Sequence, residues 1–202
     1  MTFVVLEGGE GSGKSTQAAL LAETLRAEGR EVVVTFEPGD TPTGQRIREA
    51  LLHGDDGLAP TAELLLMLAD RAQHVAEVIG PALDRGAVVV CDRYSPSTIT
   101  YQGAARGLGV EAVERWCEMA TGGLVPDAVV VLDVPDAVAA ERTGGARDRM
   151  ERAGADFHAR VRAAYRDLAP DRGWIVIDGV GEPAAVTTRV RAALGAVLPA
   201  GS

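Results

Sequence analysis

The sequence predicts a single α/β domain, and three observations lead to this prediction. Five short apolar runs alternate along the chain with segments that have the periodicity of helices. A glycine-rich loop lies between the first apolar run and the first helical segment. The length of 202 residues suits one domain, or one domain with an inserted lid. We therefore treat residues 1–202 as one domain.

The composition narrows the class of protein. Hydrophobic residues make up 47% of the chain, which is enough for a sizeable core. A formal net charge of −9 argues against broad binding to nucleic acid or to a membrane surface. The two cysteines, Cys91 and Cys117, are too few for a disulfide framework. We expect a cytoplasmic protein, because the sequence shows neither a long apolar segment nor a signal peptide.

The glycine-rich loop has the pattern of a phosphate-binding P-loop. Residues 8–15 are Gly-Gly-Glu-Gly-Ser-Gly-Lys-Ser, between the apolar run 3–6 and a helix expected over about 14–28. Such a loop turns backbone N–H groups toward phosphate oxygens, and the helix N-terminus adds its dipole. Lys14, the only lysine in the chain, would reach the β- and γ-phosphates, and Ser15 would ligate Mg²⁺. The alternative is a glycine-rich turn that only joins a strand to a helix.

The remaining elements follow from apolar runs and from helix boundary signals. Further strands are expected over residues 32–34, 88–91, 128–133 and 174–177. Further helices are expected over about 43–52, 60–79, 110–120, 153–168 and 183–198. The loop 36–42 follows the second strand, at the edge where α/β sheets bind ligands.

The long helix expected over residues 60–79 combines an apolar stripe with polar side chains. The stripe that should face the core consists of Leu64, Leu65, Leu68, Ala72, Val75 and Ile79. Met67, Arg71 and His74 share a neighbouring face, because they are spaced by about one helical turn. For His74 we favour a packing role over a functional one. Arg71 is a stronger candidate for function, since it lies beside the stripe rather than opposite it.

Two other segments carry charged side chains that are candidates for contacts with Mg²⁺ or phosphate. Asp92 ends the third strand, which is the usual place of the carboxylate that supports Mg²⁺ after a P-loop. Its alternative role is to cap the helix that follows, and both roles are compatible. Residues 142–152 contain four arginines among glycines. This composition predicts a lid that closes on phosphates, and the alternative is a solvated charged loop.

Several motifs in the same order resemble those of the thymidylate kinases, a family of P-loop nucleoside monophosphate kinases. The resemblance covers nearly the whole chain, and its motifs are 7–16, 37–39 with 41–42, 70–74, 92–94 with 97 and 101–103, 148–149 with 151, and 157–158 with 161 and 165. It implies a P-loop NTPase fold with a five-stranded parallel sheet and helices on both faces. It also implies a homodimer that uses ATP and Mg²⁺ to phosphorylate a pyrimidine deoxynucleoside monophosphate, with dTMP the expected acceptor.

The resemblance also implies roles for individual residues. ATP and Mg²⁺ would be held by Gly8, Gly11, Ser12, Gly13, Lys14, Ser15, Thr16, Arg142 and Asp92, with the adenine resting on Arg142. Glu10 would hold the sugar 3′-hydroxyl, and Arg71 and Arg93 would grip the acceptor phosphate. Gln102, Ser97 and Tyr101 would read the base and line its pocket, together with Phe36, Pro38 and Met67.

The resemblance places the catalytic arginine in the lid. Some members of the family carry this arginine in the P-loop, at the position that Gly11 occupies here. The expected catalytic arginine is therefore Arg147 or Arg149, acting beside Lys14 and Arg93.

Four positions around the acceptor depart from the bacterial pattern of the family. Phe36 stands where arginine is usual, and Asp40 stands where glycine is usual. Met67 stands where phenylalanine is usual, and Pro96 stands where aspartate is usual. These departures leave open a second hypothesis, a paralogue that phosphorylates another or a modified pyrimidine nucleotide. A third hypothesis is a nucleotide-dependent switch or binding module. The switch is disfavoured because the chain has no asparagine and so lacks the N-K-x-D motif that reads guanine.

Overall fold

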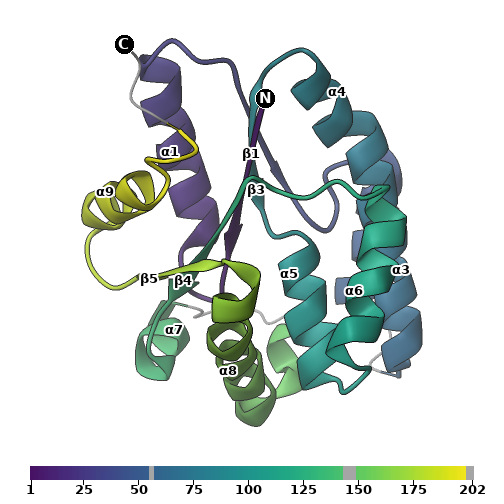
Figure 1. Ribbon diagram of the computed structural model, residues 1–202. Coiled ribbons are helices and arrows are strands. Elements are labelled where there is room, and N and C mark those ends of the chain that lie inside the picture. The colour runs from purple at the N-terminus through teal and green to yellow at the C-terminus, as the bar shows by residue number, and fades with distance from the viewer. Residues whose placement is uncertain (55–56, 143–148, 199–202) are drawn as a thin grey trace.

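A five-stranded parallel sheet forms the centre of the molecule (Figure 1). The computed structural model describes residues 1–54, 57–142 and 149–198. The strands are β1 (Thr2–Glu7), β2 (Val32–Phe36), β3 (Val88–Asp92), β4 (Ala128–Asp133) and β5 (Ile175–Asp178). They lie in the order β2-β3-β1-β4-β5, and each neighbouring pair is parallel. The predicted α/β fold with a five-stranded parallel sheet is therefore confirmed.

The register of the central strands brings their carboxyl ends to one edge of the sheet. Leu6 of β1 pairs with Asp92 of β3, and Phe36 of β2 pairs with the same residue. The loops that leave these three strands consequently start side by side. This is the edge at which open α/β sheets bind ligands.

Helices cover both faces of the sheet (Figure 1). One face packs against α1 (Lys14–Ala27) and α9 (Pro183–Ala193), through a core that includes Val4 and Leu6 of β1. The alternate residues Phe3 and Val5 belong to a second core on the other face, as the period-two geometry of a strand requires. That face carries α2 (Pro42–Leu52), α3 (Pro60–His74), α4 (Gly80–Asp84), α5 (Ser95–Thr98), α6 (Val110–Thr121) and α8 (Ala155–Arg172).

Helix α3 differs from its prediction in its end and in its buried face. It gives way at His74 to a π-helical segment, Val75–Ile79, and then to α4. Leu65 is 52% exposed and Ala72 is also exposed, so the apolar stripe was wrong at both positions. Polar side chains take their place in the interior, namely Asp70, Arg71 and His74. Spacing alone did not reveal this, because each buried polar group depends on a partner from another element.

Three further helices differ from the sequence prediction. A short helix α7 (Asp136–Arg142) follows β4 and was not predicted. Helix α8 continues through Pro170 to Arg172, beyond the expected end. Helix α9 ends at Ala193, and the turns after it still bury Leu194 and Leu198 in the core. Among the described helices, none is long and apolar enough to cross a bilayer.

Asp70 is a buried carboxyl group that is only partly satisfied. Its Oδ1 accepts a hydrogen bond from the backbone N–H of Gly39 at 3.0 Å, whereas its Oδ2 is buried with no hydrogen-bond partner among the described residues. Burial, reinforced by the nearby carboxylate of Glu37, raises the pKa of Asp70 to about 6. In the unfolded chain an aspartate has a pKa of about 3.9, so the folded state binds this proton more tightly.

Asp70→Asn should therefore stabilise the protein at high pH. The contribution of Asp70 to stability is present below pH ~4 and is lost as the pH rises through about 6, because the folded state must then ionise a buried group. At pH 8 the variant should exceed the wild type in the free energy of unfolding by about 1–2 kcal/mol, and this gain should vanish near pH 4. Urea unfolding across this pH range measures it, with the exposed Asp84→Asn as control. A gain in stability that does not change with pH would contradict a raised pKa of Asp70.

Candidate active site

The P-loop joins β1 to α1 by a path that requires glycine. Gly8 has φ of 136°, and an added Cβ would lie 2.4 Å from the carbonyl oxygen of Leu132. Gly13 has φ of 93° and is the residue that precedes the first turn of α1. Only glycine adopts such conformations without strain. The loop between them is therefore free to bring its backbone close to a phosphate chain.

Lys14 lies folded over this loop. Its Nζ donates to the carbonyl of Gly9 at 2.8 Å and to Oγ of Ser12 at 3.3 Å, and the side chain is buried. Burial lowers the pKa of Lys14. The positive charge of Arg93 lowers it further, and nearby carboxylates, above all that of Glu10, oppose this effect. A compact ammonium group held at this place can exchange its contacts for phosphate oxygens.

Ser15 and Asp92 present hard oxygen atoms beside Lys14. Oγ of Ser15 donates to Oδ2 of Asp92 at 2.5 Å, which links α1 to the end of β3. Oδ1 of Asp92 is buried with no hydrogen-bond partner among the described residues. A buried carboxylate oxygen without a partner needs an explanation, and a cation supplies one. The pair therefore fits Mg²⁺, which is usually bound by one or two protein ligands together with phosphates and water.

The other residues predicted to bind ATP lie around the same loop. Thr16 is exposed in the first turn of α1. Arg142, at the end of α7, extends to the P-loop and donates to the carbonyls of Gly11 at 3.4 Å and Gly179 at 3.3 Å. Arg142 thus bridges the P-loop and the segment after β5.

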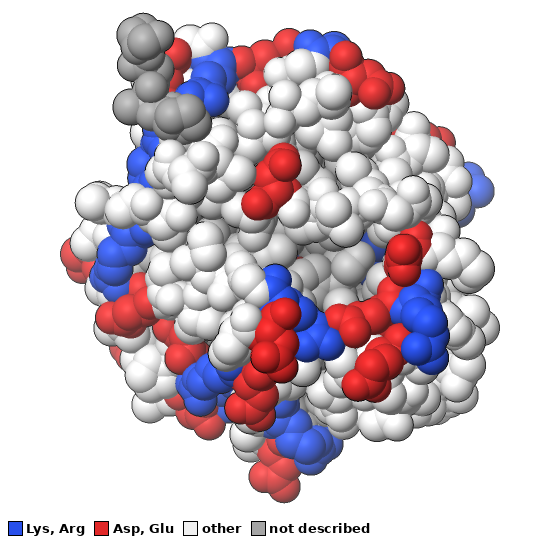
Figure 2. Space-filling model, in the orientation of Figure 1, with Lys and Arg blue, Asp and Glu red and all other residues white. Residues whose placement is uncertain are grey.

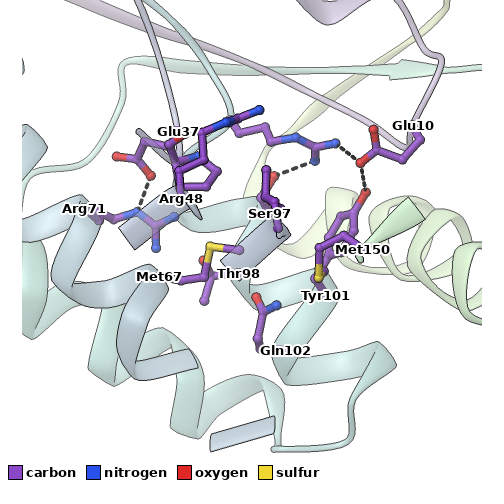
Figure 3. A pocket seen from close by; sticks show the side chains of 13 residues that line it. Glu10, Glu37, Arg48, Met67, Arg71, Ser97, Thr98, Tyr101, Gln102 and Met150 are labelled. Carbon is purple, nitrogen blue, oxygen red and sulfur yellow. Dashed lines mark hydrogen bonds and ion pairs between the residues drawn. The ribbon is translucent and has the colours of Figure 1, made fainter. Parts of the chain in front are cut away.

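A pocket opens next to the P-loop (Figure 3). Its lining comes from the P-loop, the loop after β2, α2, α3 and the segment after β3. The lining residues are Glu10, Glu37, Pro38, Arg48, Leu52, Met67, Arg71, Arg93, Ser97, Thr98, Tyr101, Gln102 and Met150. They include every residue predicted to bind the acceptor except Phe36. We refer to this space as the acceptor pocket.

A second hollow adjoins the acceptor pocket on the P-loop side. It is lined by Lys14, Ser15 and Asp92, and Phe36 lies here rather than in the acceptor pocket. Four residues line both spaces, and these are Glu10, Glu37, Arg48 and Arg93. A phosphate bound between these residues is therefore next to both spaces, as transfer between two nucleotides requires.

Arg93 and Glu10 form the centre of this shared edge (Figure 3). Nη2 of Arg93 is paired with Oε1 of Glu10, and Nη1 donates to Oγ of Ser97 at 3.1 Å. The hydroxyl of Tyr101 donates to the same Glu10 oxygen at 3.2 Å. Burial raises the pKa of Glu10, but Arg93 and Lys14 outweigh it and lower this pKa to about 2. Glu10 is thus an ionised acceptor at neutral pH.

Glu7 supports the shared edge from behind. One carboxylate oxygen accepts from the backbone N–H groups of Tyr94 at 2.9 Å and Ser97 at 3.1 Å. The other accepts from Oγ of Ser97 at 2.6 Å and from the hydroxyl of Tyr165 at 2.7 Å. Helix α5 therefore receives its cap from β1, and the alternative role of Asp92 as a helix cap is wrong: Tyr94 is the N-cap residue, without a side-chain cap.

His74 and Arg71 are held together by Glu37. Nδ1 of His74 lies 2.9 Å from Oε1 of Glu37, and Nε2 lies 2.5 Å from Oγ1 of Thr35. The packing role favoured for His74 matches these contacts. Nε of Arg71 donates to Oε2 of Glu37 at 2.8 Å, so Arg71 is anchored in the wall of the acceptor pocket. Unlike Arg93, Arg71 does not line the hollow beside Lys14.

Sequence reasoning missed Arg48 in α2. This side chain lines both spaces, donates to the carbonyl of Pro38 at 2.7 Å and lies 5.7 Å from the ring centroid of Phe36. A signal was present in the sequence. Arg48 follows Gly44 by four residues and precedes Leu51 by three, so it shares the buried face of this helix.

The predicted lid lies only partly within the described residues. Arg147, one candidate for the catalytic arginine, is outside them. Arg149, the other candidate, is buried rather than solvated: its Nε donates to the carbonyl of Leu51 at 2.7 Å and its Nη2 lies 2.7 Å from Oε2 of Glu63. In this arrangement Arg149 holds the end of α2 and not the P-loop.

Comparisons with known proteins agree with the fold and identify a family. The family model described as thymidylate kinase matches residues 6–190. The chain is 48% identical over 200 residues to a thymidylate kinase of Synechococcus sp. (strain JA-2-3B'a(2-13)), covering 98% of this chain and 96% of that protein. It is 47% identical over 206 residues to that of Clavibacter sepedonicus, covering 99% and 97% of the two chains.

A solved structure shows the same likeness in three dimensions. The crystal structure of thymidylate kinase from Ehrlichia chaffeensis has a TM-score of 0.79 and 31% sequence identity, with 96% of this chain and 98% of that chain covered. The likeness in sequence and the likeness in structure both extend over nearly the whole length of the chain. The chain belongs to the thymidylate kinase family.

Proposed function

We propose that this chain transfers the γ-phosphoryl group of ATP to dTMP, giving dTDP and ADP, with Mg²⁺ as the metal. Family membership over nearly the full length supports ATP-dependent phosphorylation of dTMP. The structural support for the proposal is the shared edge, where Glu10 and Arg93 border both the P-loop hollow and the acceptor pocket.

On the donor side, the P-loop holds the phosphates of ATP. Backbone N–H groups of Gly11, Ser12 and Gly13 and the start of α1 surround them, and Lys14 neutralises charge on the β- and γ-phosphates. Arg142 borders the adenine. Ser15 and Asp92 hold Mg²⁺, which adds charge neutralisation at the phosphates.

On the acceptor side, two arginines of the shared edge hold the phosphate. Arg93 and Arg48 both line the two spaces, so a phosphate between them faces the donor. Arg71 lines the acceptor pocket but not the P-loop hollow, so we assign it to binding the base instead of the phosphate. Glu10 accepts a hydrogen bond from the sugar hydroxyl. The base lies among Met67, Ser97, Tyr101, Gln102 and Pro38.

The chemical step needs positioning and charge neutralisation rather than a covalent intermediate. Arg93 fixes a phosphate oxygen of dTMP for in-line attack on the γ-phosphorus, and Lys14 meets the charge on the transferred group. Arg149 is engaged elsewhere, which leaves Arg147 as the lid arginine that we assign to the transition state. The lid is part of a single kinase domain spanning residues 1–202.

An ADP-release assay with a panel of acceptors tests this function. We expect fast release with dTMP, slower release with other pyrimidine monophosphates, and very slow release without acceptor. Inert dTMP with a different active pyrimidine nucleotide would establish the paralogue hypothesis instead. Fast release that no acceptor accelerates would instead identify an ATP-hydrolysing switch.

Lys14→Ala should lower kcat by several orders of magnitude while leaving the protein folded. The ammonium group is the only lysine charge available to the β- and γ-phosphates, and the residue contributes little to the apolar core. Lys14→Arg should also be poor, since a planar guanidinium does not match the space of an ammonium. Steady-state kinetics and circular dichroism measure both effects. Near-normal turnover of Lys14→Ala would contradict the donor site.

Met67→Phe should lower the KM for dTMP by up to about tenfold. Met67 lines the acceptor pocket, where a ring could lie on the base and add stacking energy on the order of 1 kcal/mol. Met67→Leu, which adds no ring, is the matched control and should not lower KM. An unchanged KM in Met67→Phe would place the base away from this side chain.

We also propose a homodimer formed through α3 and α6. These helices pack side by side (Figure 1). Three large apolar side chains on them are exposed, namely Leu65, Trp116 and Met119. Met119 is 76% exposed, and apolar groups of this size rarely gather on the surface of a monomer without a partner. Burying them against a second copy would remove this apolar surface from water.

Met119→Glu should shift the protein from dimer to monomer. A carboxylate buried at the centre of the interface would lack a partner, which weakens association by at least about tenfold. Sedimentation equilibrium at micromolar concentration measures the shift, and Val180→Glu on another surface is the control. A monomeric wild type would contradict the proposed dimer.

A cytoplasmic location and the absence of nucleic-acid binding complete the proposal. Both cysteines are free and buried, as is common in a reducing compartment. The net charge is −9, and acidic and basic side chains of the described residues are interspersed on the face shown in Figure 2. A net negative charge repels a phosphate backbone, and interspersed charges offer it no continuous basic path on this face.

A further inference from the structure

A buried cluster around Glu63 closes one side of the acceptor pocket. Glu63, on α3, is 1% exposed and is in contact with three side chains from two other segments. Its Oε1 accepts from Nε2 of Gln102 at 2.8 Å and from Nε of Arg106 at 3.3 Å. Its Oε2 lies 3.2 Å from Nη2 of Arg106 and 2.7 Å from Nη2 of Arg149.

This cluster determines which way the amide of Gln102 points. A carboxylate between two guanidinium groups has only acceptor atoms, and an amide has one donor end and one acceptor end. Gln102 must therefore direct its NH₂ group toward Glu63. Its carbonyl oxygen is then left on the pocket side, and Figure 3 shows it turned toward the part of the pocket where Met67 and Thr98 lie.

We propose that Glu63 is a positioning residue that sets base specificity by fixing the amide of Gln102. The proposal rests on the proposed function, in which Gln102 reads the base. Thymine and uracil carry an N3–H donor, which a fixed carbonyl accepts. Cytosine has an acceptor at N3 and would place it against the Gln102 oxygen, leaving both acceptors unpaired. Glu63 thus selects pyrimidines that donate at N3, although it does not line the pocket itself.

Glu63→Gln tests this role, because it should reverse the amide of Gln102. Both Arg106 and Arg149 can only donate, so they should hold the new carbonyl oxygen at the place of Oε2. The new NH₂ group then faces Gln102, which must turn its own carbonyl toward it and its NH₂ group toward the pocket. Among the residues that the structure describes, the one contact that opposes this reversal is the long one from Nε of Arg106 at 3.3 Å.

The measurement is kcat/KM for dTMP and for dCMP in wild type and variant. We expect the ratio of dTMP to dCMP to fall by at least about tenfold in Glu63→Gln, mainly through KM for dTMP and a gain with dCMP. A purely structural role would lower both values together and leave the ratio unchanged. Glu49→Gln, exposed on α2, is the matched control and should preserve the ratio.

A swapped pair keeps the test decisive if Glu63→Gln does not fold. The double variant Glu63→Gln with Gln102→Glu retains one carboxylate in the cluster and again presents an acceptor oxygen to the pocket. We expect it to recover the preference for dTMP to within about tenfold of the wild type. A double variant that prefers dCMP, or a single variant that folds and keeps the wild-type ratio, would overturn the proposal.

Gln102→Met separates this inference from the proposed function. If Gln102 reads the base, removing its amide should reduce the ratio of dTMP to dCMP while Glu63 keeps both arginines. An unchanged ratio in Gln102→Met would refute base reading by Gln102. A reduced ratio in Gln102→Met together with an unchanged ratio in Glu63→Gln would refute only the role of Glu63.

Discussion

The ion pair between Glu10 and Arg93 is the interaction on which the site depends. Glu10 belongs to the P-loop after β1, and Arg93 follows β3, the neighbouring strand. Their pairing joins the donor hollow to the acceptor pocket. Arg93 adopts φ of 73°, a conformation that costs a residue with a side chain about 1–2 kcal/mol. The contacts to Glu10 and Ser97 offset this cost and direct the guanidinium between the two spaces.

Charge balance explains how so many ionised groups can lie inside this protein. Glu7 accepts four hydrogen bonds, although burial still raises its pKa. Glu37 is paired with Arg71 and His74, and Glu63 with two arginines. Each carboxylate thereby orients a group that lines the acceptor pocket, so the same contacts that satisfy buried charges also shape the site.

The sequence was sufficient to predict the sheet and the P-loop, because both follow from local patterns. Apolar runs identified all five strands, and the order of glycines around Lys14 identified the loop. The same local rules failed at Leu65 and Arg149. Leu65 matches the core spacing but is exposed, and Arg149, which we expected in a lid over the phosphates, is buried against Glu63. Both outcomes depend on partners that are distant in sequence, whereas the helix spacing of Arg48 was a local signal that sequence reasoning overlooked.

The kinetic effect of Arg93→Gln tests whether Arg93 links the donor hollow to the acceptor pocket. Arg93 borders both spaces, so its loss should lower kcat/KM for dTMP by at least about a thousandfold in protein that remains folded. Arg85→Gln, in an exposed ion pair with Glu31, is the matched control and should keep wild-type kinetics. An Arg93→Gln variant that is folded and turns over dTMP within threefold of the wild type would show that the site does not depend on Arg93.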